Sequence, residues 1–277
     1  MLSLLFALTT AIVWGTADFC GGKASQRAAA LAVAVLSRLA GLPVLALGLI
    51  FLGGAPTTAA LGWGAVAGLF GMSGVTLLYR ALAAGSMTVV APVTAVTSAL
   101  VPFLIGIALD GAPGTAAMVG AACAIGAIAL VSAGPGDGHK PIGPAVVGLA
   151  LAAGASFGLF MTLLSRAGDG VGLWPLAASQ LTGLGVGWLL LWRTRTAARL
   201  TGTALRWAVP AGALDFAANI AYLLAARDGV LSVVAPIASL YPATTILLAL
   251  AIDRERIRPL QLAGLVLAAT ALVLVVV

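Results

Sequence analysis

Charge is what this sequence has least of. Only 8% of its 277 residues are Asp, Glu, Lys or Arg, whereas hydrophobic types make up 62%. Soluble globular domains carry about 25% charged residues, which cover their water-facing surface. The composition therefore excludes an ordinary soluble domain. The apolar side chains are too many for one buried core, and most of them must face lipid.

Residues that bind metals or form disulfides are also scarce. The chain has one histidine, His139, and two cysteines, Cys20 and Cys123. A zinc site needs several such ligands, and a disulfide framework needs more cysteines placed in loops. The chain also lacks the HExxH and P-loop patterns. We therefore predict no cofactor, no metal and no enzymatic activity.

Long apolar runs are what the sequence has instead. A helix of about 20 apolar residues is long enough to cross a bilayer. Ten runs have this length: 2–20, 29–52, 62–84, 86–109, 113–133, 144–165, 171–192, 205–226, 230–252 and 259–277. We therefore predict an all-α polytopic membrane protein with ten transmembrane helices.

The two halves of the chain resemble each other at a constant offset of 144 residues. Trp63 matches Trp207 at this offset, and the run Val-Val-Ala-Pro at 89–92 recurs at 233–236. A unit of five helices reverses its orientation in the second copy, because five is odd. The sequence thus predicts two inverted five-helix repeats, an architecture that many secondary transporters use.

A Gly- and Pro-rich segment separates the two repeats. Such turn chemistry marks a linker between spans. We place the first repeat at 1–135, the linker loop at 136–143 and the second repeat at 144–277.

Basic residues lie mostly in the loops after odd-numbered runs. Eleven Lys and Arg residues lie there, against only Arg166 and Arg227 after even-numbered runs. The positive-inside rule places the richer set in the cytoplasm, with both chain ends on the opposite side. The net charge of +6 is therefore explained by topology, and we expect no nucleic-acid partner.

Three ionisable residues lie inside apolar runs: Asp18, Arg38 and Asp215. A charge near the bilayer centre costs roughly 2.5–3.5 kcal/mol, so such residues are candidates for function. Asp215 shares a helix face with Asn219 and Tyr222, which lie four and seven residues on. This stripe indicates a cavity wall or, alternatively, a polar cluster between packed helices. Arg38 could pair with either acid or extend to the membrane interface.

Aromatic, hydroxyl and acidic side chains in the runs define the predicted substrate site. We expect a midplane cavity walled by the first, third, fourth, sixth, eighth and ninth runs. Its predicted substrate-binding residues are Trp14, Asp18, Tyr79, Thr94, Thr97, Asp215, Asn219, Tyr222 and Tyr241. Pro92 and Pro236 occupy equivalent places in the two halves, where each removes a helix hydrogen bond and predicts a kink.

Short motifs stand out at both ends of the chain: Trp14-Gly15, Asp18-Phe19, Gly21-Gly22-Lys23, the stretch 239–245, Glu255-Arg256, Gln261 and Gly264. Together they resemble the drug/metabolite transporter superfamily, in its ten-helix EamA-like branch. The first half departs from the pattern, since Asp110-Gly111 stands where a Glu-Arg pair is expected. Phe157-Gly158 stands where Trp14-Gly15 does in the first half, at an offset slipped by one. The resemblance implies efflux or exchange of metabolites or drugs across a bacterial inner membrane.

The sequence therefore favours a secondary transporter of a small organic solute, working by alternating access, with proton coupling left open. Asp215 is the candidate proton carrier. The alternative is a lipid-handling or scaffolding membrane protein without ion coupling. The partners expected are a small-molecule substrate and the lipid bilayer. The chain could be a monomer or a homodimer, because Gly-x-x-x-Gly motifs at 64–68, 154–158 and 183–187 let helices approach closely in either case.

The topology can be tested by labelling. Single cysteines at Arg195 and Ala55 should react with a membrane-impermeant thiol reagent from opposite sides of the membrane, with Ala55 reactive in whole cells. External reactivity of the Arg195 position would reverse the orientation. Labelling of both positions from one side would contradict the number of spans.

Overall fold

The structure is a computed structural model that describes residues 2–110, 114–132, 143–168, 170–197, 200–228, 234 and 237–276. Pro236, most of the predicted linker and the first residues of the ninth apolar run lie outside the described residues.

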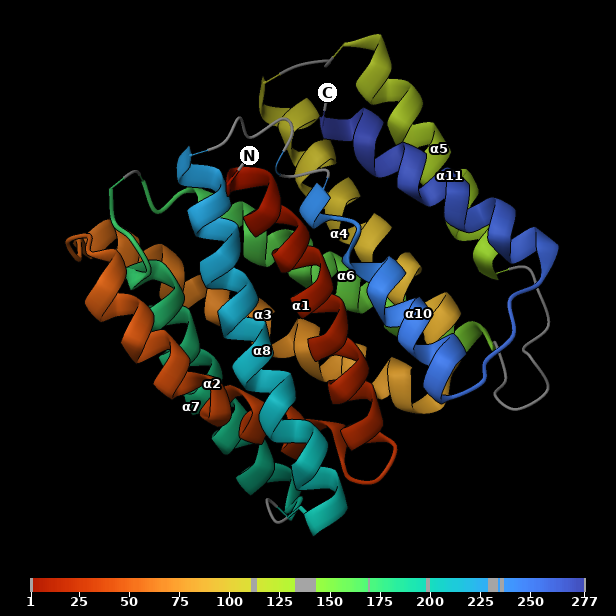
Figure 1. Cartoon of the computed structure of the whole chain (residues 1–277). Coiled ribbons are helices and arrows are strands. Elements are labelled where there is room, and N and C mark those ends of the chain that lie inside the picture. Colours follow the sequence, from red (N-terminus) through yellow and green to blue (C-terminus); the bar gives the residue numbers. More distant parts are fainter. Residues whose placement is uncertain are drawn as a thin grey trace.

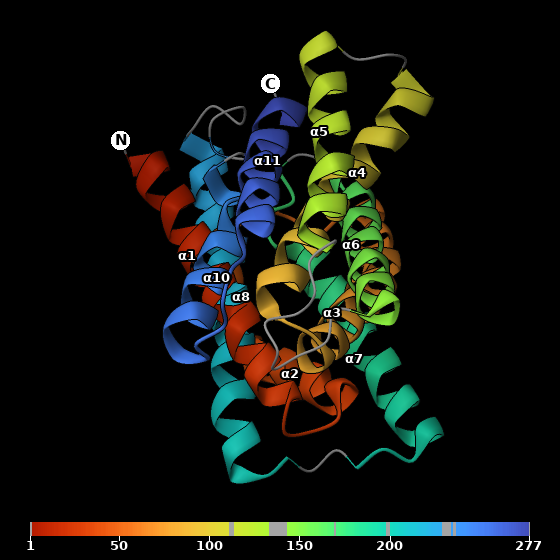
Figure 2. The same cartoon turned by 90° about the vertical axis from the view of Figure 1, so that its right-hand side faces the viewer.

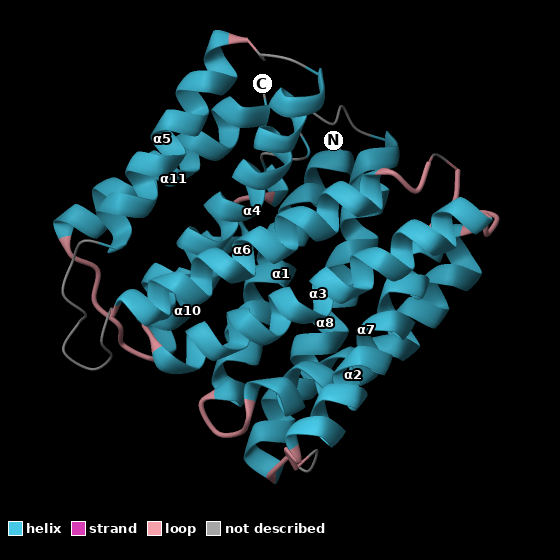
Figure 3. Cartoon of the chain, turned by 180° about the vertical axis from the view of Figure 1, so that it is seen from behind, coloured by secondary structure: helices cyan, strands magenta, loops and turns pink. Residues whose placement is uncertain are grey.

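The regular elements of these ranges are helices, as Figures 1 and 3 show. They are α1 (Leu2–Ser25), α2 (Ala30–Leu52), α3 (Thr58–Ala84), α4 (Met87–Asp110), α5 (Thr115–Ser132), α6 (Pro144–Ser165), α7 (Trp174–Thr194), α8 (Gly202–Asp228), α10 (Tyr241–Ile252) and α11 (Pro259–Val276). Each predicted apolar run overlaps one of them. The all-α prediction is therefore confirmed for the described residues.

Length and composition confirm six of the predicted spans. Helices α1, α2, α3, α4, α6 and α8 are long and apolar enough to cross a membrane, and α5, α10 and α11 contain shorter apolar segments. Large apolar side chains such as Ile50, Phe51 and Leu181 lie exposed on the outside of the bundle. Such a surface is suited to lipid and not to water.

Helices of the first half pack mainly on helices of the second. The main pairs are α1 with α8, α5 with α11, α3 with α6, α3 with α7, α4 with α6, and α2 with α8. This pattern is largely preserved when the halves are exchanged. The α1–α8 pair then becomes α6–α3, α2–α8 becomes α7–α3, and α4–α6 becomes the less extensive α10–α1 contact. The α5–α11 pair stands at one edge of the bundle, and both chain ends lie at the same end (Figures 1 and 2).

Glycines make the close contacts between the halves. Gly64 and Gly68 of α3 face backbone atoms of α7, and Gly154 and Gly158 of α6 face α4. The tightest approach is that of Gly212 in α8, whose Cα faces the backbone of Ser37 in α2. Without a hydrophobic effect between helices in lipid, such close packing supplies much of the attraction. The glycine motifs therefore serve packing within one chain.

The Gly212 contact predicts a sharp effect of one methyl group. A Cβ at this position would overlap the Ser37 backbone, which has no side-chain freedom to move away. We expect Gly212→Ala to destabilise the fold by about 1–3 kcal/mol, the usual cost of overpacking, and to lower the midpoint of thermal unfolding in detergent. The matched control is Gly185→Ala in α7, where an added Cβ meets no atom within 4 Å. Equal midpoints for the two variants would contradict this account of the α2–α8 contact.

Candidate substrate cavity

A cavity lies at the contact between the two halves. Its volume is about 160 Å³, and residues of α1, α2, α3, α4, α6, α7, α8 and α10 line it. A cavity of about 150 Å³ can hold a molecule the size of benzene, so this one has room for a small organic molecule. Six predicted site residues lie in its wall together with Arg38: Trp14, Asp18, Tyr79, Asp215, Asn219 and Tyr241.

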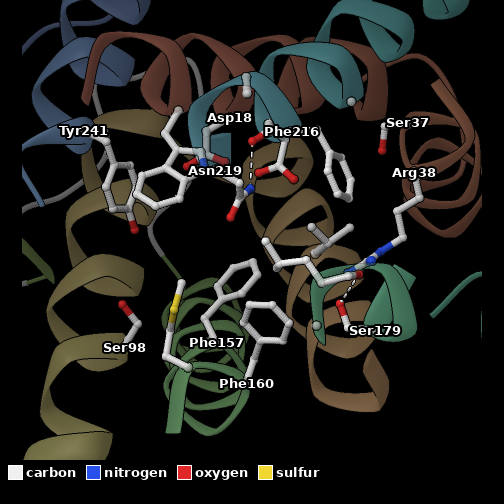
Figure 4. A pocket seen from close by; sticks show the side chains of 18 of the residues that line it. Asp18, Ser37, Arg38, Ser98, Phe157, Phe160, Ser179, Phe216, Asn219 and Tyr241 are labelled. Atoms are coloured by element: carbon white, nitrogen blue, oxygen red, sulfur yellow. Dashed lines mark hydrogen bonds between the residues drawn. The ribbon is translucent and has the colours of Figure 1, made fainter. Parts of the chain in front are cut away.

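Helices α1 and α8 form a polar wall. Trp14 and Asp18 come from α1, and Asp215 and Asn219 come from α8. The indole of Trp14 lies within hydrogen-bonding reach of the Asp215 carboxylate. The Asn219 amide donates to the Asp215 carbonyl oxygen at 2.7 Å, which fixes its orientation on the helix. In Figure 4, Asp18 and Asn219 lie together on one side of the cavity.

Arg38 of α2 is held by a side chain that the sequence did not single out. Its Nη1 donates to Oε1 of Gln180 in α7 at 2.7 Å, and the Gln180 amide donates back to the Arg38 carbonyl oxygen. Within the described part of the chain, no carboxylate lies within 4.0 Å of the guanidinium, and its Nε–H has no hydrogen-bond partner. Arg38 thus forms no direct ion pair with Asp18 or Asp215, although its charge interacts with that of Asp215. It is oriented by Gln180 and lines the cavity.

Helices α3 and α6 form the opposite wall, which is apolar. Val75 comes from α3, and Phe157, Phe160 and Met161 come from α6. Figure 4 shows Phe157 and Phe160 across the cavity from Asp18 and Asn219. The cavity therefore has one polar side and one apolar side.

The two walls occupy equivalent positions of the repeat. At the offset of 144, Gly71 corresponds to Asp215 and Val75 to Asn219. With the slip of one residue between α1 and α6, Asp18 corresponds to Met161, and all six of these residues line the cavity. The backbone arrangement is thus repeated, while the side-chain chemistry is not.

The slip does not change the packing role of the aromatic-glycine pair. Gly15 of α1 lies against the backbone of α10 at Tyr241, and Gly158 of α6 lies against the backbone of α4 at Ser98. Trp14 and Phe157, the residues before these glycines, both line the cavity. Phe157-Gly158 is therefore the structural counterpart of Trp14-Gly15.

Three predicted site residues lie behind the cavity wall. Tyr222 packs against Trp14, with ring centroids 5.7 Å apart, beside an apolar cluster. The Thr94 hydroxyl donates to the Ala150 carbonyl oxygen in α6 at 3.2 Å, and that of Thr97 donates to its own helix. Their hydroxyl groups support packing around the cavity. Pro92 lies inside α4, which continues past it.

The sequence prediction omitted α2 and α7 as walls, although Ser37 and Ser179 line the cavity. Gln180 was missed as well, although a glutamine inside an apolar run is a visible signal. Its side chain is fully buried, so its amide needs partners inside the protein. The hydrogen bonds to Arg38 supply them.

Contacts between the halves close the bundle where α1, α3 and α10 end. Lys23 forms an ion pair with Asp253, which follows α10. Glu255 in the same loop accepts hydrogen bonds from the Ser86 hydroxyl at 2.6 Å and from the backbone N–H groups of Met87 and Thr88 at 3.1 and 3.0 Å. A carboxylate there caps the N-terminus of α4 and complements the helix dipole. We call the Lys23–Asp253 ion pair and the hydrogen bonds of Glu255 the basic-end contacts.

The comparisons with known proteins agree with this arrangement. Residues 1–133 and residues 145–277 each match the EamA-like transporter family. The chain belongs to the EamA-like transporter family. It is therefore a multi-pass integral membrane protein from a family of transporters for small solutes.

Structural similarity to this EamA-like transporter extends over the whole chain. Eleven chains of solved structures match it, and one crystal structure aligns with a TM-score of 0.64 at 17% sequence identity, covering 99% of this chain and 96% of that one. Identity at this level shows a shared fold and nothing further. None of the curated proteins compared matches this sequence significantly.

The Arg38–Gln180 pair of this EamA-like transporter yields a stability prediction. Gln180→Met keeps the approximate volume but removes both hydrogen bonds and leaves the guanidinium without them. Hydrogen bonds to charged groups contribute about 1.5–3 kcal/mol, so we expect a clear fall in the thermal unfolding midpoint. The control is Ser179→Ala, because that hydroxyl only donates within its own helix, to the Leu176 carbonyl at 2.9 Å. Equal falls in both variants would show that the pair does not stabilise the fold.

Proposed function

We propose that this protein is a secondary transporter that exports or exchanges a small organic solute through the central cavity by alternating access, coupled to protons. The observation that carries the proposal is the cavity between the halves, with two carboxylates and an arginine in its wall. Charges at membrane depth are costly and are retained where they serve transport. The proposed location is a bacterial inner membrane, which the family resemblance implies.

Alternating access needs two halves that can rock against each other. Three observations support an inverted repeat. The main helix pairs map onto one another when the two halves are exchanged, each half matches the family separately, and both chain ends lie at the same end of the bundle. In such transporters the substrate binds near the midplane, between the repeats. The cavity has this position relative to the two halves.

The basic-end contacts would serve as the gate on one side. They join α1 and α4, which belong to the first half, to the loop after α10, which belongs to the second. Opening that end requires the Lys23–Asp253 pair and the Glu255 hydrogen bonds to separate together. Conversely, their formation stabilises the state that is closed there.

Asp215 is the proposed proton carrier. It lines the cavity together with Asp18 and Arg38, and its charge interacts with the charges of both. With all three ionised, the two acids outnumber the arginine by one charge. Binding of one proton or one cation therefore neutralises the cavity, which lowers the cost of exposing it alternately to the two sides.

Replacement of Asp215 by Asn tests the coupling. We expect Asp215→Asn to fold normally and to retain substrate exchange in proteoliposomes, but to lose accumulation driven by an imposed pH gradient. The solutes supplied are a panel of radiolabelled amines, amino acids and carboxylates, and Asp18→Asn is the matched comparison. Poor expression of Asp215→Asn, partly rescued by a second change at Arg38, would indicate a structural acid.

Full gradient-driven accumulation by well-folded Asp215→Asn would eliminate the carrier role. Movement of lipid probes by the wild type, with no effect of pH gradients and no transport of any solute in the panel, would favour the lipid-handling alternative.

The gate is tested by accessibility. In a background with Cys20→Ala and Cys123→Ala, a cysteine replacing Tyr79 reports on the cavity next to the basic-end contacts, because the Tyr79 ring lies against Gly21 near the end of α1. Adding Glu255→Gln should increase its reaction rate with an impermeant maleimide applied from that side by about tenfold, since each 1.4 kcal/mol shifts an equilibrium tenfold.

The control for the gate is Arg256→Gln, which changes an exposed neighbour of buried Glu255. An unchanged rate in folded Glu255→Gln protein would mean that these hydrogen bonds do not hold the end closed.

A further inference from the structure

We infer that a groove at the end of α7 binds an anionic phospholipid, with the lipid phosphate at two arginines and an acyl chain against two tryptophans. The inference goes beyond the proposed transport function, because the groove lies outside the central cavity. Three features carry it: the lining of the groove, the excess of positive charge around it, and the backbone conformation of Arg195.

The groove lies where α7 ends, at the end of the bundle opposite to the two chain ends (Figure 2). Its volume is about 660 Å³. We call it the α7 groove, and the described residues that line it are Trp188, Leu191, Trp192, Arg193, Arg195 and Thr196. None of these residues lines the central cavity. A ligand of the α7 groove therefore leaves the cavity unoccupied.

Two tryptophans place the groove at the surface of the membrane. Trp188 and Trp192 lie one helical turn apart on one face of α7, and both are exposed. Leu189 and Leu190 are exposed on the same turns. Tryptophan is enriched at the boundary between lipid headgroups and hydrocarbon, because its ring is apolar and its N–H is polar. The last turns of α7 therefore suit the depth at which acyl chains meet headgroups.

The charge around the groove is of one sign. The segment from Arg193 to Arg206 contains four arginines and no acidic residue. Arg193 and Arg195 are exposed, and neither has an ion-pair partner among the described residues. Guanidinium groups bind phosphate oxygens through two parallel hydrogen bonds. The loop charges predict that this segment is cytoplasmic, and the cytoplasmic leaflet is the one with a negative surface potential.

The backbone of Arg195 shows that an arginine is kept there at a cost. Its φ is 51°, in the left-handed region where a helix usually ends on glycine. Residues with a side chain are disfavoured in that region, and such strain is a reason to look for a function. The Arg195 guanidinium forms no hydrogen bond or ion pair with the described residues. We therefore assign its use to a ligand.

The end of α7 is prepared for a negative ligand in a second way. The last carbonyl oxygens of a helix are free and form the negative end of its dipole, which repels anions. Here the Thr194 hydroxyl donates to the Leu190 carbonyl at 2.7 Å, and the Thr196 N–H donates to the Leu191 carbonyl at 3.1 Å. The Arg195 N–H donates to the Trp192 carbonyl at 3.2 Å. These carbonyls are thus occupied, and the two arginines determine the charge that a ligand meets.

The test compares two lipids that differ in headgroup charge. Full-length protein in detergent is titrated with phosphatidylglycerol and with phosphatidylcholine, both with brominated acyl chains that quench nearby tryptophan fluorescence. The double variant Trp188→Phe, Trp192→Phe gives the quenching of the other tryptophans, which is subtracted. We expect phosphatidylglycerol to bind at the α7 groove at least tenfold more tightly than phosphatidylcholine.

Two arginines in the same backbone conformation provide matched variants. Arg195→Gly removes a charge from the groove, and Arg254→Gly removes one from the loop after α10, where φ is 55° and the side chain is exposed. Glycine suits both positions, so neither variant should lower the thermal unfolding midpoint. Each arginine near an anionic lipid contributes a factor of about five in affinity. Arg195→Gly should therefore weaken binding of phosphatidylglycerol about fivefold, and Arg254→Gly should leave it unchanged.

Three outcomes would overturn the inference. Equal binding of the two lipids would show that the groove does not recognise headgroup charge. Equal weakening by the two glycine variants would reduce the effect to a general attraction between basic loops and anionic lipid. Displacement of phosphatidylglycerol by inorganic phosphate would identify a site for free phosphate. If Arg195→Gly fails to fold, Arg195→Asn takes its place, because asparagine also tolerates the left-handed conformation.

Discussion

Every polar group inside the bilayer must find a partner within the protein, and the arrangement of this molecule follows from that constraint. Hydroxyl groups along the helices meet it locally, as Thr10 and Thr16 do by donating to carbonyl oxygens one turn earlier. Buried Gln180 meets it through Arg38 on another helix. The remaining charged groups face the cavity, where water or a solute can serve them. The cavity is thus the one place in the described core where unpaired charge is tolerable.

The helices were largely predictable because hydrophobicity over twenty residues depends only on local composition. The run at 144–165 coincides with α6, and the run at 29–52 begins one residue before α2. The ionisable cavity residues were predictable for a related reason. Asp18, Arg38 and Asp215 stand out in apolar surroundings, and burying a charge is costly on whichever face of the helix it lies.

It was harder to predict which face of each helix turns toward the cavity, because that depends on the helices it packs against. Tyr222 shares a stripe with Asp215, yet the close approach of α1 directs it behind Trp14. Thr94 looked like a pore residue but bonds to a carbonyl of α6. The sequence predicted α3 and α6 as walls of the cavity but not their apolar lining, since Phe157 and Phe160 differ in no local way from lipid-facing aromatics. The capping of Ser86 by Glu255 spans 169 residues, which no local pattern reports.

The cap that Glu255 places on α4 also has a consequence for biosynthesis. The start of α4 leaves the ribosome about 170 residues before the carboxylate that satisfies it. Over that interval the N–H groups at the start of α4 have only water or lipid headgroups to bind. Similarly, α1 is synthesised long before α8, the helix it packs against. The nascent first half must therefore remain loosely associated in the membrane until synthesis is nearly complete. A truncation that removes only α10, α11 and the loop between them would leave the chain without the Glu255 cap and exposed to membrane proteases.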